Sequence, residues 1–164
     1  MSVDVVIEAE DWDAAGLEAV AERACGAALD WLGCTGAEVV VLGCDDARIA
    51  ALNADFRGKP RATNVLSWPS VEHAPRAPGA RPAPPEVDEL GDIAIAFQTC
   101  RDEAAAQGKT LADHAAHLLV HAVLHLAGYD HENDPDAEAM EAAECAILAT
   151  IGIPDPYAEP ATLA

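Results

Sequence analysis

The segment from His121 to His131 constrains the fold of this chain more than any other. Its spacing is His-x-x-x-His-x-x-Gly-x-x-His, in a chain that has six histidines. Residues four apart lie on one face of a helix, so His121 and His125 can bind one metal ion from the same side. Gly128 is the residue type most able to leave a helix with positive φ, and the turn can bring His131 back toward the ion. The segment therefore predicts a metal site on a helix and the turn after it.

Three imidazoles and a water molecule in the fourth position are typical of catalytic zinc, so the prediction is one zinc ion per chain. A non-catalytic zinc site is the alternative, but such sites are normally closed by a fourth protein ligand. Asp130 could be that ligand, or it could orient a histidine. His117 lies near the same helical face and is a candidate for holding a ligand histidine, whereas we expect a structural role for His114.

The histidine spacing is also that of the metzincin proteases, with one difference. Those enzymes carry Glu directly after the first histidine, as the general base that activates the zinc-bound water. Here that position is Ala122, whose methyl group accepts no proton. A metalloprotease-like hydrolase is therefore the second hypothesis, behind another metal-dependent hydrolase.

Hydrophobic patterning predicts four strands and about five helices in a single domain over residues 1–164. The strands are expected at Val3–Ile7, 38–42, 64–68 and 92–97, and the helices at 13–31, 45–56, 98–107, 110–127 and 135–151. Strands at the beginning and helices at the end favour the α+β class, with helices packed on a small mixed four-stranded sheet. Between the last two strands, residues 70–89 are rich in proline, and we expect an exposed, mobile loop there.

The net charge and its distribution limit the kinds of partner that the chain can bind. The net charge of −20 argues against broad affinity for nucleic acid or anionic membranes. Five of the nine Lys and Arg residues lie between Arg57 and Arg81, and of these Arg57, Lys59 and Arg61 could form a local basic patch. Scattered, solvated charge is the expectation for Arg76 and Arg81.

The location follows from what the sequence lacks. It has no apolar run near the roughly 20 residues that span a bilayer, and no secretory signal at its start. The five cysteines form no Cys-x-x-Cys pair. These features favour a reduced, cytoplasmic protein without a membrane contact.

Several segments together resemble one family. The run from His121 to His131, with the segments Leu52-Asn-Ala-Asp-Phe-Arg57, Thr63-Asn-Val-Leu-Ser-Trp-Pro69 and Leu90-Gly-Asp-Ile93, is similar to the YbeY family of bacterial metal-dependent endoribonucleases of ribosomal RNA maturation. The acidic segment around Glu138 and the ending Gly152-Ile-Pro-Asp-Pro-Tyr157 fit as well. Ala122 stands where the family commonly has Gly, Trp68 where it has Phe, and the proline-rich loop is longer than usual.

The resemblance implies a nuclease of single-stranded RNA in late small-subunit ribosomal RNA processing and ribosome quality control. Its partners would be ribosomal RNA and the small ribosomal subunit, and the acidic surface suits basic ribosomal proteins. Arg57 would stabilise charge on the scissile phosphate. We expect a metal-bound water to attack, because no carboxylate follows His121 to act as a base. A non-catalytic, zinc-stabilised, ribosome-associated module is a third hypothesis.

Three further residues have weaker predicted roles. Lys59 and Arg61 are candidates for contacts to backbone phosphates. Asp92, at the start of a predicted strand, could hydrogen-bond a ligand imidazole or cap a turn.

Overall fold

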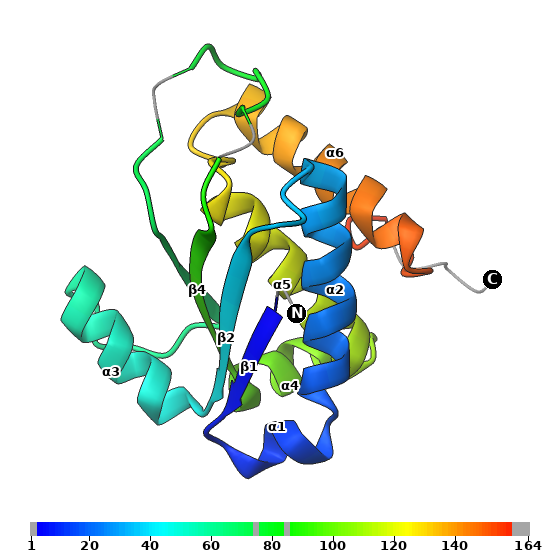
Figure 1. Cartoon of the computed structure of the whole chain (residues 1–164). Helices are drawn as coiled ribbons and strands as arrows, with labels where there is room; N and C mark the ends of the chain where they lie inside the picture. The colour runs from blue at the N-terminus through cyan, green and yellow to red at the C-terminus, as the bar shows by residue number, and fades with distance from the viewer. Residues whose placement is uncertain (1–2, 74–75, 84–85, 159–164) are drawn as a thin grey trace.

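The computed structural model describes residues 3–73, 76–83 and 86–158, and within them four strands form one mixed sheet (Figure 1). The strands are β1 (Val3–Ile7), β2 (Glu38–Cys44), β3 (Val65–Pro69) and β4 (Glu89–Ala96). Their order is β1-β2-β4-β3, and only the edge strand β3 runs antiparallel to its neighbour. The predicted α+β class and mixed four-stranded sheet are confirmed.

The described residues also form six helices, one more than the sequence analysis predicted. They are α1 (Glu10–Ala14), α2 (Leu17–Leu32), α3 (Asp46–Arg57), α4 (Phe97–Ala106), α5 (Leu111–Leu126) and α6 (Asp134–Thr150). None of the helices in this part of the chain is both long and apolar enough to cross a membrane.

The sheet has a helix layer on each face (Figure 1). Ile93 and Ile95 of β4 lie in the larger core, with buried residues of α2 and α5. Ala94 alternates with them and points to the other face, where it lies in a smaller core with Ile49 of α3. Helix α5 contacts α2, α4, α6, β3 and β4, so it is surrounded by protein along most of its length. The candidate ligands on α5 are therefore held by a rigid element.

The predicted helix over residues 13–31 was wrong at its beginning, because the chain forms two helices there. Gly16 has φ of 75°, in the left-handed region, and this separates α1 from α2. Trp12 of α1 is buried, and its Nε1 donates to the carbonyl oxygens of Cys44 and Ile95, at 3.0 Å each. These bonds hold α1 against the ends of β2 and β4, a tertiary effect that local periodicity does not show.

Most of the described residues in the proline-rich connection between β3 and β4 are exposed, as expected, but His73 and Arg76 pack against the end of α5, which contradicts the solvated position expected for Arg76. The Arg76 side chain is only 17% exposed and donates to the carbonyl oxygen of Gly128 at 2.7 Å. His73 Nε2 lies 2.8 Å from the carbonyl oxygen of Leu126. Carbonyls near a helix C-terminus lack partners within the helix, so these side chains supply donors for them. Arg81 is exposed, as expected, with its guanidinium 4.3 Å from the centre of the Trp31 ring.

Candidate metal centre

The structure brings the three predicted ligand histidines together. His121 and His125 are one turn apart on α5, and His131 follows in the segment between α5 and α6. One side-chain nitrogen from each lies within 4.8 Å of those of the other two. Imidazole nitrogens bind zinc at about 2.0–2.1 Å, so nitrogens on one ion lie within about 4.2 Å of one another. Small side-chain shifts would bring the three histidine nitrogens to this separation.

Burial and neighbouring charges keep His125 neutral. Its pKa is lowered to about 4, first by burial and then by the charges of His121 and His131. At pH 7 its ring therefore keeps a lone pair available, which is the form that binds a metal. The three-imidazole donor set and the neutral form of His125 both fit a divalent ion.

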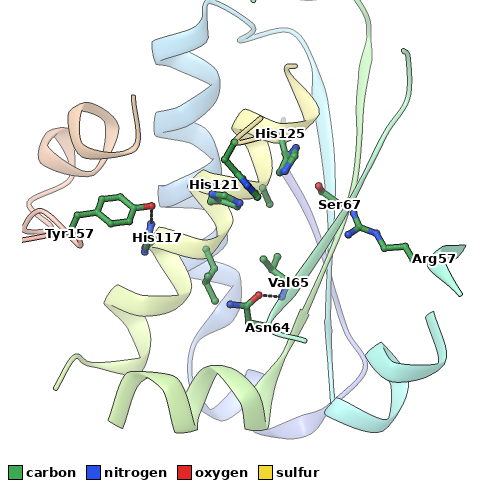
Figure 2. Close-up of a pocket in the computed structure, with 11 residues that line it drawn as sticks. Arg57, Asn64, Val65, Ser67, His117, His121, His125 and Tyr157 are labelled. Atoms are coloured by element: carbon green, nitrogen blue, oxygen red, sulfur yellow. Dashed lines mark hydrogen bonds between the residues drawn. The ribbon is translucent and has the colours of Figure 1, made fainter. Parts of the chain in front are cut away.

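A cavity of about 320 Å³ opens beside the histidines and collects residues from four parts of the chain. Arg57 comes from the end of α3, Asn64 and Ser67 from the region of β3, and Tyr157 from the segment after α6 (Figure 2). Ala122 also lines the cavity, so the position after the first histidine carries no carboxylate here. The site therefore combines a possible cation site with one arginine.

Asn64 is held in place by a series of partly buried hydrogen bonds. Its Nδ2 donates to Glu103 Oε1 at 3.1 Å, and its Oδ1 accepts from the backbone of Val65 at 2.7 Å. Glu103 Oε1 in turn lies 2.9 Å from Nε2 of the buried His114. These hydrogen bonds are consistent with the structural role expected for His114. They fix the position of one wall of the cavity.

Glu144 of α6 is a residue that the sequence reasoning missed. It is 1% exposed and lies against His117 Nε2 at 2.5 Å, His121 Nδ1 at 3.3 Å and the Tyr157 hydroxyl at 2.7 Å. Burial by itself would raise the pKa of Glu144, but hydrogen bonds from His117, His121 and Tyr157 hold it down, to about 2. The sequence did contain a signal for a buried acid, because Glu144 is spaced at helical intervals from Met140 and Ile147. All three residues are buried on α6.

The other candidates for orienting a histidine are placed differently from one another. His117 lines the cavity and reaches His121 only through Glu144. Asp130 lies 4.0 Å from Arg76 and acts on His125 through its charge, which raises the pKa of that ring. Asp92 is not brought to the histidines. It is exposed on the α3 face of β4, because it alternates with Ile93, which faces α5.

The two candidates for phosphate contacts are both exposed. Lys59 and Arg61 follow α3 and do not line the cavity, whereas Arg57 does. Of the three residues in the predicted basic patch, only Arg57 lines the cavity beside the histidines.

Gly128 should be required for the turn that carries His131. It has φ of 105°, and a Cβ atom there would lie 3.0 Å from the His73 ring. We expect Gly128→Ala to lower the free energy of unfolding by about 1–3 kcal/mol, since it adds a crowded neighbour to an unfavourable backbone conformation. Chemical denaturation measures this. Gly108→Ala is the matched control, with φ of 67° and open space around the added Cβ. An equal loss in both variants would show that crowding against His73 contributes nothing.

The fold and the site define an α+β protein with a three-histidine candidate metal centre beside an arginine. The family model described as Endoribonuclease YbeY matches residues 4–152. The chain belongs to the YbeY family, which confirms the resemblance found in its motifs.

Individual proteins agree with this assignment. A protein from Paracoccus denitrificans is 64% identical over 96% of this chain and 90% of its own length. A protein from Jannaschia sp. is 52% identical over 96% of this chain and 100% of its own length. Both are named Endoribonuclease YbeY. The solution structure of TM1509 from Thermotoga maritima, 22% identical, matches over 98% of this chain and 99% of that chain with a TM-score of 0.57, so it shares the fold.

Proposed function

We propose that this chain is a zinc-dependent endoribonuclease that cleaves single-stranded RNA, acting as one domain with one zinc ion. The observation that carries the proposal is that Arg57 and the three histidines line the same cavity. A cation site and a guanidinium on one cavity suit a substrate that carries negative charge, such as a phosphodiester. The names of the related proteins support the same reaction class.

The residues of the cavity have separate tasks in this proposal. His121, His125 and His131 would hold the zinc ion, which when bound polarises a phosphoryl oxygen and lowers the pKa of a coordinated water toward about 7. Arg57 presents N–H donors to the phosphate oxygens as charge develops on them. Asn64 and Ser67 offer polar groups on the β3 side of the cavity, where they can orient the sugar-phosphate backbone.

The attacking group is proposed to be water. None of the described residues that line the cavity is an aspartate or a glutamate, so no lining carboxylate can take a proton from a ribose 2′-hydroxyl. The products are then expected to end without a 2′,3′-cyclic phosphate. Cyclic phosphate ends would instead show attack by the neighbouring 2′-hydroxyl.

A cleavage assay separates this function from the two alternatives. The zinc-loaded protein is incubated with single-stranded RNA, with duplex RNA and with casein, and the products are resolved on gels. We expect cleavage of the single strand alone. Cleavage of casein alone would favour the protease hypothesis in spite of Ala122. Failure to cleave any of the three, together with binding to ribosomes, would favour the non-catalytic module.

We propose late small-subunit ribosomal RNA processing and ribosome quality control in the cytoplasm as the setting. The net charge of −20 disfavours tight binding of free RNA and suits basic ribosomal proteins as partners on the small subunit. Co-sedimentation of the protein with purified small subunits tests this. Equal binding to naked ribosomal RNA and to subunits would count against delivery by protein partners.

A further inference from the structure

Glu144 is the only described acid that hydrogen-bonds a histidine of the candidate ligand set. Its Oε2 lies 3.3 Å from His121 Nδ1. The candidate ligand cluster in the described part of the chain does not include Glu144. Glu144 can therefore act on the His121 ring through its Nδ1 atom, and it is not itself a candidate ligand.

The chemistry of the contact defines the protonation of the His121 ring. A carboxylate can only accept hydrogen bonds, so His121 Nδ1 must carry the proton that lies between them. In a neutral imidazole the other nitrogen, Nε2, then holds the lone pair. Only that nitrogen can bind a metal.

Two further donors hold the carboxylate in place. The Tyr157 hydroxyl donates to Oε1 at 2.7 Å, and His117 Nε2 donates to the same oxygen at 2.5 Å (Figure 2 shows both side chains). Oε1 therefore has two donors, which leaves Oε2 to His121. Since Glu144 is 1% exposed, water does not compete for these bonds.

We propose that Glu144 is a positioning residue that sets the Nδ1–H tautomer of His121 and so presents Nε2 to the metal, with His117 and Tyr157 orienting the carboxylate. This inference rests on the proposed zinc site. It gives His117 an indirect role, and it assigns a role to the segment after α6, which brings Tyr157 to the site.

Glu144→Gln is the variant that tests the proposal. The amide oxygen of Gln can accept from Tyr157 and His117, as Oε1 does, which turns the amide NH₂ toward His121. His121 Nδ1 must then accept, and the proton moves to Nε2, where it blocks metal binding. We expect zinc to bind about 10–100-fold more weakly, the range found when a group that orients a ligand is lost. Glu141→Gln, an exposed position on the same helix, makes the same charge change and should bind zinc like the wild type.

The tautomer itself can be measured without metal. Long-range ¹H–¹⁵N NMR of the apo protein should show His121 protonated at Nδ1 in the wild type and at Nε2 in Glu144→Gln. A wild type protonated at Nε2 overturns the proposal even if the variant does not fold. So does a Glu144→Gln protein that binds zinc like the wild type while His125→Ala does not, and that result leaves the proposed function intact. A wild type that binds no zinc would contradict both.

Discussion

His125→Ala is expected to abolish zinc binding and to lower RNA cleavage by at least about 10³-fold, or about 4 kcal/mol of transition-state stabilisation. The reason is the loss of one of only three candidate ligands, since the nitrogens of His121, His125 and His131 all lie within 4.8 Å of one another. With one imidazole removed, two protein ligands are left, fewer than the three of a catalytic zinc site. Metal content measured by mass spectrometry and single-strand cleavage under saturating substrate check the two parts of this expectation.

The thermal stability of the protein with and without zinc provides the control for His125→Ala. A ligand that binds only the folded state at 100 times its dissociation constant stabilises a protein by about 2.7 kcal/mol. For a protein of this size that corresponds to a rise in Tm of about 5–10 °C. The wild type should show this rise with zinc and the variant should not, while chelator-treated wild type should behave like the variant. Full cleavage by His125→Ala after chelation would contradict a metal-centred mechanism.

The candidate ligands were predictable because their geometry is local. His121 and His125 are one helical turn apart, and Gly128 places the following turn, so eleven consecutive residues contain all three candidate ligands. The strands were also predictable, because each is a short apolar run with its own boundaries. Such features depend on the backbone period, which a sequence displays directly.

The residues around the ligands were not predictable in this way, because they reach the site through packing. Glu144 lies 23 positions from His121 and meets it only because α6 packs on α5. The orientation of Asp92 depends on which face of β4 is covered by α5, and the residues after it, Ile93–Ala96, are buried on both faces and give no alternation from which to infer it. Arg76 was misread for the same reason, since its partners include the carbonyl oxygen of Gly128, after α5, and the carboxylates of Asp130 and Asp136.

Arg57→Gln is expected to lower kcat for RNA cleavage by about 10²–10³-fold, the effect of removing one preorganised donor to developing negative charge. Arg57 lines the cavity with the histidines but is exposed and comes from a different helix, so its loss should leave the fold unchanged. Zinc should bind at least as tightly as in the wild type. The charge of Arg57 lowers the pKa of His125, so it disfavours positive charge at that position, and Gln removes this repulsion.

Two further variants distinguish the effect of the Arg57 guanidinium donors from the effect of positive charge alone. Arg57→Lys keeps the positive charge and loses the planar pair of donors, so its kcat should fall between those of Gln and the wild type. Arg101→Gln is the matched control, an exposed arginine that pairs with the neighbouring Asp102 and does not line the cavity. It should cleave RNA like the wild type. If Arg57→Gln and Arg101→Gln reduced kcat equally, the effect would be one of general charge, and Arg57 would have no direct part in phosphodiester cleavage.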